Sequence, residues 1–337
     1  MGRLILAVFG AGRAGSIHAR NAVMTGRAEI KWIVDAVPNN GRKLSDELPS
    51  QAKVVKFGDH DQVLQDKSVN AVIVTVPSLM HEEVIKGCLK AGKAVFCEKP
   101  LTLDSLSTKE CFELSQANGK PLICGFNRRF DPTVRSIHDQ VQRGTLGQIK
   151  SIKICSRDPE YPTGEYAKSS GGIFKDACCH DIDIICYILK EFPETVYAIG
   201  HAFNPDIASV GDYDQVFIVM KFPSGVNASI DMNRKAVYGY DQRLEVFGSK
   251  GMLQEGNLRP TATILNTSDG ERQDSLVVQF SDRYKDAYRN EMDHFIDVIA
   301  GQRDSLVTGK QTEAVIKIAE ACLQSVETGQ AVKMDYS

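Results

Sequence analysis

A glycine-rich turn directly after an apolar segment constrains the fold of this chain more than any other feature. The sequence AVFGAGRAG follows the spacing Gly10-x-Gly12-x-x-Gly15, at the end of a strand-like segment and the start of an amphipathic one. In a strand-turn-helix unit, the first glycine allows a tight turn, the second lets the backbone approach a pyrophosphate, and the third lets helix and strand pack closely. The helix N-terminus then favours the negative charge. The motif predicts a dinucleotide site at Gly10, Ala11, Gly12, Arg13, Ala14 and Gly15.

An acid stands where such a unit binds the adenosine ribose. Asp35 ends the next strand-like segment, 20 residues after Gly15. A carboxylate there accepts a hydrogen bond from the ribose 2′-hydroxyl and repels a 2′-phosphate, so the sequence favours NAD over NADP. Arg42 lies near enough in sequence to keep NADP as the less favoured alternative. The other alternative is that this glycine turn and the nearby acid bind no ligand. In that case the glycine spacing, its place between a strand and a helix, and the acid at the end of the next strand would coincide by chance.

The first part of the chain alternates between short apolar segments and amphipathic ones. The apolar segments are continuous rather than alternating with polar residues, which is typical of parallel strands buried on both faces. Strand, helix and strand in repetition predict a doubly wound sheet, the Rossmann arrangement, over residues 1–125. The predicted strands are 3–10, 29–36, 70–77, 93–100 and 121–126.

The periodicity changes after residue 126. Later strand-like segments alternate apolar and polar residues, and FPSGV at 222–226 resembles a hairpin turn, so antiparallel pairing is expected. We therefore predict a second domain over residues 126–337, of α+β class, with an open and mostly antiparallel sheet. Helices are expected at 283–301 and 310–328. The predicted strands are 147–158, 194–203, 214–225, 226–235, 242–251 and 274–280.

Composition excludes several classes of protein. A chain of 337 residues normally forms two domains. The net charge of −3 gives no sign of a nucleic-acid or membrane-surface binder. The apolar segment at 70–77 is far shorter than the roughly 20 residues of a membrane helix, and the N-terminus lacks a signal-peptide pattern. Nine cysteines, an odd number without a CxxC pair, favour reduced thiols and a cytoplasmic location.

Two further segments contain groups able to do chemistry. Glu98, Lys99 and Pro100 follow a predicted strand, and ligands of open α/β sheets bind beyond the carboxyl ends of strands. The alternative for this triplet is a solvated Glu–Lys pair. The second segment is FKDACCHDID, at 174–183.

If the helix of this second segment begins at Asp176, then Asp176, Cys179, His180 and Asp183 share one face. That face could be a metal site, since histidine, cysteine and aspartate all bind transition metals. It could instead hold a general base, His180, with Asp176 one turn earlier to orient it and to stabilise its protonated form. The third alternative is an ordinary polar helix start with a satisfied histidine. Cys178 is expected in the interior, whereas Cys179 is expected near the reactive face, where its alkylation would inhibit.

These segments together resemble the Gfo/Idh/MocA oxidoreductase family. The resemblance rests on GAGRAGSIHA, VTVPSLMHEEVIKGCLKAGKAVFCEKP and GGIFKDACCHDIDIICYIL, which stand in the family's order and cover essentially the whole chain. Within the family, GFNRRFDP, SRDP and YGYD are most similar to the inositol dehydrogenases. The resemblance implies an NAD-binding Rossmann domain and a second domain whose open sheet forms a homotetramer or a homodimer.

The resemblance also implies roles for individual residues. Lys99 would hydrogen-bond the reacting hydroxyl, and Asp176 and His180 would form the acid–histidine pair. Asp158 stands where inositol dehydrogenases have asparagine, which leaves the details of polyol recognition open, because an ionised carboxylate accepts hydrogen bonds but donates none. Further cofactor contacts are expected from Val76, Pro77, His81, Glu98 and Lys99. The expected substrate contacts are Lys99, Asn127, Asp158, Asp176, His180 and Tyr240.

The resemblance thus implies hydride transfer from a secondary hydroxyl of a cyclic polyol to NAD, without a metal. His180 would take the hydroxyl proton, and Lys99 would stabilise the developing alkoxide. Three alternatives stay open. The chain could be a sugar dehydrogenase or reductase of the same family, a non-catalytic NAD-binding regulator, or a zinc alcohol dehydrogenase.

Overall fold

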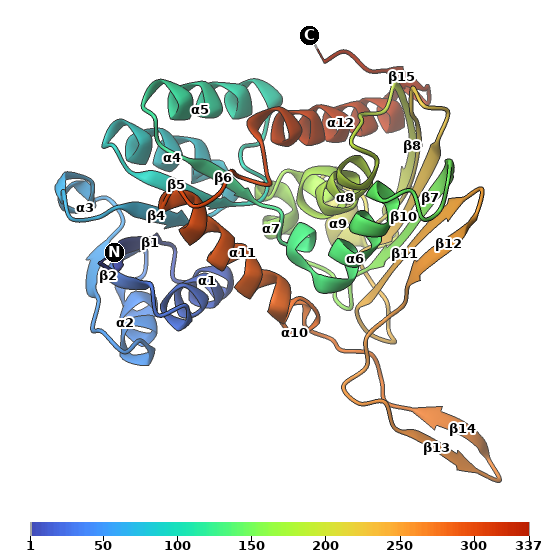
Figure 1. Cartoon of the computed structure of the whole chain (residues 1–337), viewed down its shortest axis with the longest axis horizontal. Coiled ribbons are helices and arrows are strands. Elements are labelled where there is room, and N and C mark those ends of the chain that lie inside the picture. Colours follow the sequence, from blue (N-terminus) through green and yellow to red (C-terminus); the bar gives the residue numbers. More distant parts are fainter. Residues whose placement is uncertain (1, 337) are drawn as a thin grey trace. The chain divides into compact units, whose positions relative to one another are not determined.

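The structure is a computed structural model that describes residues 2–336. Contacts divide the chain into two compact units (Figure 1). Unit 1 contains the described residues up to Phe130 together with Asp286–Lys317. Unit 2 contains Asp131–Lys285 together with the described residues from Ile318 onward. The chain therefore passes between the units three times, and part of the segment after residue 126 belongs to unit 1.

Unit 1 is built on a parallel sheet in the order β3-β2-β1-β4-β5-β6. This is the strand order of a doubly wound dinucleotide-binding fold, as the sequence predicted. β3 was not predicted, because KVVK is too short and too polar to stand out as a buried strand. The strands are β1 (Leu4–Phe9), β2 (Ala28–Asp35), β3 (Lys53–Lys56), β4 (Ala71–Val74), β5 (Ala94–Glu98) and β6 (Leu122–Gly125).

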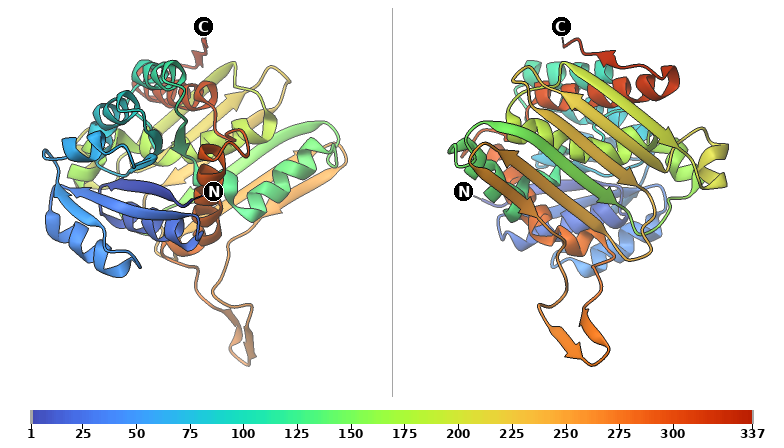
Figure 2. Two further views of the ribbon diagram at one scale, coloured as in Figure 1. Left: turned by 60° about the vertical axis from the view of Figure 1, so that its left-hand side comes forward. Right: turned by 90° about the vertical axis from the view of Figure 1, so that its right-hand side faces the viewer.

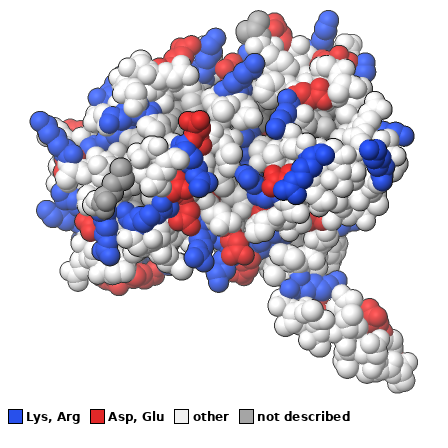
Figure 3. Space-filling view, in the orientation of Figure 1, with Lys and Arg blue, Asp and Glu red and all other residues white. Residues whose placement is uncertain are grey.

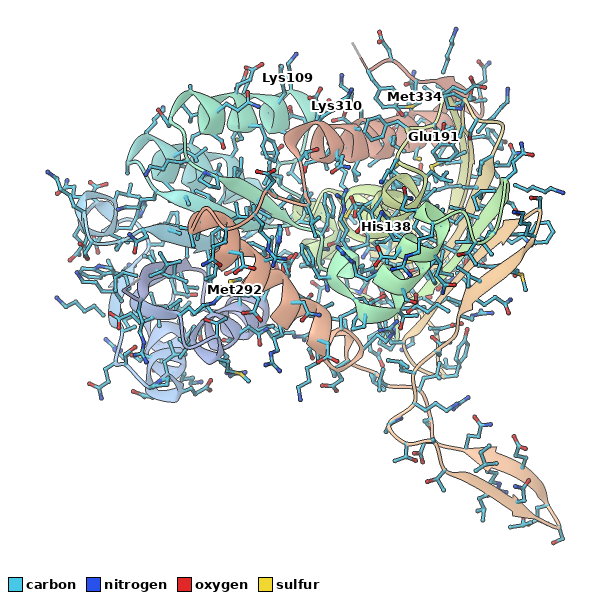
Figure 4. All side chains as sticks on the ribbon, viewed as in Figure 1. Lys109, His138, Glu191, Met292, Lys310 and Met334 are labelled. Carbon is cyan, nitrogen blue, oxygen red and sulfur yellow. The ribbon has the colours of Figure 1, made fainter. Side chains whose placement is uncertain are left out.

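Helices cover both faces of this sheet, with α1 and α2 on one face and α4 and α5 on the other (Figure 1). α11 returns from late in the sequence and packs its Phe295 against Phe96 of β5, with Met292 completely buried (labelled in Figure 4). Arg27 also bonds Asp293 and Asp297 of α11. The helical segments are α1 (Arg13–Met24), α2 (Pro38–Glu47), α3 (Asp61–Gln65), η1 (Ser78–Met80), α4 (His81–Lys90), α5 (Ser105–Ala117), η2 (Asn127–Phe130), α11 (Lys285–Ile299) and the first part of α12 (Gly309–Thr328).

Unit 2 is built on a mixed sheet in the order β12-β11-β7-β10-β9-β8-β15. All neighbouring pairs in this sheet are antiparallel except β7 and β10, which run parallel. The predicted α+β class and mostly antiparallel sheet are therefore confirmed. Its strands are β7 (Ile149–Arg157), β8 (Thr195–His201), β9 (Gln215–Lys221), β10 (Asn227–Asn233), β11 (Asp241–Gly248), β12 (Gly251–Glu255) and β15 (Val332–Lys333).

The two faces of the second sheet differ. Burial alternates along β8 and β9, so that one face is buried against helices and the other is exposed. In Figure 2 (right), the strands of this sheet are turned toward the viewer. His138 of α6 (labelled in Figure 4) stacks on Tyr187 of α8 within that helical layer. The helical segments are α6 (Pro132–Gln142), α7 (Gly164–Ser169), η3 (Phe174–Cys178), α8 (Cys179–Leu189), α9 (Pro205–Ser209) and α10 (Phe280–Arg283), followed by the second part of α12.

The predicted strand at 274–280 is wrong. A separate hairpin forms instead, from β13 (Ile264–Thr267) and β14 (Gly270–Gln273), which pair only with each other (Figure 1). Residues 274–279 return from the hairpin without joining a sheet, although the Tyr240 N–H donates to the Val277 carbonyl. The apolar run LVV misled the prediction because Val278 is half exposed rather than buried in a ladder.

The surface and the helices agree with the bulk composition. Among residues 2–336, every helix is too short or too polar to cross a membrane. Lysine and arginine side chains are interspersed with aspartate and glutamate on the face drawn in Figure 3.

Candidate active site

The glycine turn between β1 and α1 has the geometry that the motif requires. Gly10 has a φ of 98°, and a Cβ there would lie 2.5 Å from the Thr75 carbonyl oxygen. A Cβ at Gly15 would lie 1.9 Å from the Gly10 oxygen, so this position admits only glycine. A Cβ at Gly12 would meet no atom within 4 Å. The backbone is therefore open at the position where a pyrophosphate would approach.

The start of α1 fits an anion as well. Gly12 provides no side-chain cap, and the first turn contains no acidic residue. The dipole and the N–H groups of this helix end thus face no competing side-chain carboxylate from the turn itself. The residues around the turn fit the diphosphate of a dinucleotide.

Asp35 ends β2 and ties the glycine turn in place. Its Oδ2 accepts a hydrogen bond from the Ala11 N–H at 2.7 Å, and its Oδ1 accepts one from the Val37 N–H at 2.8 Å. Each carboxylate oxygen has a second lone pair and can accept a ribose hydroxyl as well. Asp35 is thus held by the backbone in the position where the fold binds the ribose.

His81 links two loops at the carboxyl ends of β4 and β5. Its Nε2 lies 2.8 Å from the Val76 carbonyl oxygen and its Nδ1 lies 2.8 Å from the Pro100 carbonyl oxygen. The side chain is only 1 % exposed. Burial lowers the pKa of His81, and the two carbonyl contacts oppose that effect. His81 can thus affect cofactor binding by holding the backbone at Val76, Pro77 and Pro100 in place.

Glu98 and Lys99 lie at the end of β5. The Glu98 carboxylate contacts His18 Nε2 of α1 at 2.7 Å and accepts the Lys99 backbone N–H at 3.1 Å. Burial alone would raise the pKa of Glu98, but His18 and Lys99 lower it below its ordinary value. His18 is fully buried against Phe96 and was not predicted. The signal for it was a histidine three residues after Gly15 on the inner face of α1.

Asn127 lies in η2 directly after β6 and is 2 % exposed. Its neighbour Arg129 is completely buried and donates to the Leu306 carbonyl and to Gln311 Oε1. Arg129 therefore fastens the returning C-terminal segment to unit 1, beside Asn127. Asn127, Glu98 and Lys99 all follow neighbouring strands at the carboxyl edge of the parallel sheet.

The segment FKDACCHDID is not one uniform helix. Phe174–Cys178 forms a π-helical turn, and α8 begins at Cys179. The expectation of a single α-helical face through Asp176, Cys179, His180 and Asp183 is therefore wrong in its geometry, because a wider turn changes the angle between Asp176 and the later residues. Asp176 lies in the π turn, and His180 is the second residue of α8. π turns of this kind are frequent at functional sites.

Asp176 is 6 % exposed, and partners hold both of its oxygens. Tyr166 of α7 donates its hydroxyl to Oδ1 at 3.0 Å, and Arg234 donates to Oδ2 at 3.1 Å. His180 is half-buried. Arg234 and Tyr166 were not predicted, since no spacing in the sequence connects residues 166, 176 and 234.

The cysteines of this segment are buried. Cys178 is completely buried, as expected, and burial raises its pKa well above the ordinary value. Cys179 is also completely buried, and its Sγ lies 3.6 Å from the Asp176 carbonyl oxygen. The expectation that Cys179 is open to alkylation is therefore wrong for the folded chain. Asp183 is 1 % exposed on α8. Within residues 2–336, no three histidine, cysteine or acidic side chains are grouped as metal ligands.

Asp158 and Tyr240 also belong to unit 2. Asp158 follows β7, and its backbone bonds to Asn233 and to Ala236. Tyr240 precedes β11, is 7 % exposed and meets Tyr284 edge to face, with ring centroids 6.2 Å apart. The expected site residues therefore fall into two groups. Unit 1 contains the cofactor residues, Lys99 and Asn127, and unit 2 contains Asp158, Asp176, His180 and Tyr240.

Comparison with known proteins agrees with this arrangement. Residues 4–126 match the family model described as the NAD-binding Rossmann fold of the Gfo/Idh/MocA oxidoreductases. Residues 138–334 match the C-terminal α/β domain of the same family.

Individual relatives match over nearly the whole chain. The myo-inositol 2-dehydrogenase of Thermotoga maritima is 36% identical, with 98% of each chain covered. The crystal structure of a myo-inositol dehydrogenase from Corynebacterium glutamicum is 33% identical, with a TM-score of 0.91 and 99% of each chain covered. The scyllo-inositol dehydrogenase of Lactobacillus casei, solved with NAD(H) and scyllo-inositol, is 27% identical, with a TM-score of 0.90, 98% of this chain and 99% of that chain covered.

Both family models, the strand order of the first sheet and the geometry of the glycine turn lead to one assignment. This chain belongs to the Gfo/Idh/MocA family of NAD-binding oxidoreductases.

Proposed function

We propose that this oxidoreductase is an inositol 2-dehydrogenase, which converts myo-inositol and NAD to 2-keto-inositol and NADH. The proposal rests mainly on the full-length similarity to proteins named as inositol dehydrogenases. It is supported by the presence of Lys99, Asp176 and His180, which can supply a general base and a positive charge for the oxidation of a secondary hydroxyl.

In this proposal, the turn Gly10–Gly15 and Asp35 hold the cofactor together with Val76, Pro77, His81, Glu98 and Lys99. NAD, when bound, supplies the acceptor for the hydride that leaves the substrate carbon. His180 takes the hydroxyl proton as general base. Lys99, as an ammonium, stabilises the negative charge that develops on the substrate oxygen. Asp176 favours the protonated form of His180 through its negative charge. Asn127, Asp158 and Tyr240 bind the other hydroxyls of the ring.

The two parts of the chain have different tasks in this proposal. Residues 1–125 bind NAD, and residues 126–337 bind the polyol and form the contacts of a homotetramer or homodimer. The exposed face of the second sheet supports an oligomer, because Tyr197, Ile199, Phe217 and Val219 are between 39% and 51% exposed on neighbouring strands. A cytoplasmic location fits the nine cysteines, none of which forms a disulfide within residues 2–336.

A substrate panel tests the proposal. Purified protein is incubated with myo-inositol, scyllo-inositol or glucose, each with NAD or NADP, and NADH or NADPH absorbance is followed. We expect the highest kcat/KM with an inositol and NAD. A preference for glucose would replace the proposal with a sugar dehydrogenase of the same family. Binding of NAD in calorimetry without turnover of any polyol would favour a non-catalytic regulator.

A further inference from the structure

One arginine of unit 2 is buried among carboxylates and pairs with Asp176, four residues before the proposed general base. Arg234 is 2 % exposed. It donates to Asp176 Oδ2 at 3.1 Å, and its second terminal nitrogen lies 3.6 Å from Asp212 Oδ2. Asp158 also contributes to the field at Arg234. Burial lowers the pKa of Arg234, but the three carboxylates together raise it above the ordinary value, so the guanidinium stays charged.

The only parallel strand pair of the second sheet, among the described residues, brings these groups together. β7 and β10 end side by side, with Arg157 opposite Asn233. Asp158 and Arg234 are the next residues of the two strands, so they leave the sheet at the same edge. Asp212 reaches this edge from the start of β9, where Gln215 pairs with Asn233. The cluster is therefore a consequence of sheet topology, which explains why sequence spacing does not reveal it.

Asp212 connects the cluster to the backbone of the π turn. Its Oδ1 accepts a hydrogen bond from the Ile173 N–H at 2.9 Å. The preceding residues Gly171 and Gly172 have φ values of 90° and 78°. A Cβ on Gly172 would lie 2.9 Å from Asp212 Oδ1. Asp212 thus holds the backbone at the start of the π turn. Arg234 pairs with both Asp212 and Asp176, and Asp176 lies four residues before His180 in the sequence.

Tyr166 completes the arrangement on the other side of Asp176. Its hydroxyl donates to Oδ1, opposite the oxygen that Arg234 holds, while the residue as a whole is 50% exposed. Two donors from different elements therefore fix both oxygens of one carboxylate. Buried carboxylates of this kind are oriented far more narrowly than a carboxylate in water, and charged hydrogen bonds are the strongest of the available restraints.

We propose that Arg234 is a positioning residue of the dehydrogenase reaction, which holds Asp176 ionised and oriented and thereby sets the basicity of His180, with Tyr166 as its partner. This inference rests on the proposed function above. Arg234 acts through Asp176 and through Asp212, and it has no place in the proton or hydride transfer itself. Its positive charge partly offsets the negative charge of Asp176, Asp212 and Asp158.

The proposal predicts the direction in which the pH profile of Arg234→Gln moves. Removing the positive charge leaves the carboxylates uncompensated, which favours protonated His180. The acid limb of the kcat/KM profile with inositol and NAD should therefore move to higher pH. The kcat should fall about 10-fold or more, the equivalent of one charged hydrogen bond, while the KM for NAD stays unchanged. Arg234→Lys keeps the charge and should leave the acid limb in place with a smaller fall in kcat.

Arg283 offers a matched control in the same unit. It is 4 % exposed and pairs with two buried carboxylates, Asp131 and Glu255. Arg283→Gln removes an equally buried guanidinium and should lower thermal stability without moving the acid limb. Tyr166→Phe serves if Arg234→Gln fails to fold, since its half-exposed ring remains. It should lower kcat by about 3- to 10-fold, as expected for one hydrogen bond.

Histidine NMR gives a readout that does not need turnover. The chain has seven histidines, and the NMR signal that disappears in His180→Ala identifies the titration of His180. We expect the His180 titration to move to higher pH in Arg234→Gln and to stay in place in Arg283→Gln. A wild-type protein without polyol turnover would overturn the proposed function alone. If the wild type is active but neither the His180 titration nor the acid limb of kcat/KM moves in Arg234→Gln, the role of Arg234 is overturned. Equal movement in Arg234→Gln and Arg283→Gln would overturn it as well.

Discussion

Asp35 illustrates how one side chain can serve both the fold and cofactor choice. Its carboxylate accepts backbone N–H groups from Ala11 in the glycine turn and from Val37 after β2. These bonds hold the carboxylate at the end of β2, and in the proposed cofactor site its negative charge would face the 2′-phosphate of NADP. The nearest basic residue of α2 in sequence, Arg42, is exposed.

Asp35→Ser should therefore change the cofactor preference. The serine hydroxyl loses the charge and part of the hydrogen bonding, so kcat/KM with NAD should fall by about 10- to 100-fold, as for loss of a charged hydrogen bond. The value with NADP should fall less or rise, because the repulsion of the 2′-phosphate is gone. The ratio of the two values from initial rates decides. An unchanged NAD-to-NADP ratio would contradict the assigned role of Asp35.

Lys99 and His180 permit a second prediction at the residue scale. Lys99→Ala and His180→Ala each remove a group that acts on the reacting hydroxyl in the proposed mechanism, and Lys99 is also a proposed cofactor contact. We expect kcat with inositol to fall by about 100-fold or more, the usual contribution of a general base or of a charge that stabilises a developing oxyanion. NAD should still bind to His180→Ala with a near-normal Kd in calorimetry. Near-normal turnover by either variant would remove that residue from the mechanism.

At the scale of elements, regular segments could be predicted and irregular ones could not. The strands β1, β4, β5 and β6 are largely continuous apolar runs, and that pattern is typical of buried parallel strands. The hairpin β13–β14 is exposed along both strands, so burial left no pattern in its sequence. The π turn at Phe174–Cys178 depends on Gly171, Gly172 and contacts to Asp212, which lies far away in the sequence.

The same reason explains which site residues were missed. Gly10, Asp35 and Lys99 follow strand ends and could be found from local sequence. His18 and Arg234 act through partners about 80 and 58 residues away, Glu98 and Asp176, and only the folded chain joins them. A buried charged side chain produces no periodic pattern in the sequence. Its burial depends on an ion-pair partner that is distant in sequence, and the adjacent residues do not reveal that partner.

The contact between α1 and β5 makes a prediction about acid stability. The pKa of Glu98 is held below its ordinary value, with His18 as the main stabilising partner. A depressed carboxyl pKa contributes stability above the unfolded-state pKa, and that contribution is lost as the pH falls through the folded-state pKa. Between the two values, the free energy of unfolding rises with pH.

Glu98→Gln should therefore flatten the dependence of unfolding free energy on pH below about 4.5, the region where an unfolded glutamate titrates. Urea unfolding followed by Trp32 fluorescence measures this in unit 1, since Trp32 is the single tryptophan and lies in β2. Glu83→Gln, at an exposed position of α4, is the control and should leave the slope unchanged. Equal slopes in wild type and Glu98→Gln would contradict the role of the His18–Glu98 contact.

For the whole molecule, the exposed face of the second sheet is the feature that a single chain does not explain. Tyr197 lies opposite Val219 and Ile199 lies opposite Phe217 across β8 and β9, so four apolar side chains form one continuous patch. Contiguous apolar patches on sheets are a common mark of protein–protein contact. The antiparallel strands complete their hydrogen bonds within the sheet, so this apolar face stays open in a single chain. A second copy of the chain that covered the patch would bury its apolar side chains and be stabilised by doing so.

Phe217→Glu tests this at the scale of the assembly. A charge at the centre of the patch would be buried without a partner in a face-to-face contact, which costs several kcal/mol, on the order of the affinity of a weak interface. We expect the mass measured by light scattering after gel filtration to fall from that of a tetramer or dimer toward that of one chain, with the secondary structure in circular dichroism unchanged. Leu106→Glu, at a 65% exposed position of α5, is the matched control and should leave the mass unchanged. If wild type and Phe217→Glu have the same mass, the oligomer forms through another surface, and if the wild type is a single chain, the homo-oligomer itself is excluded.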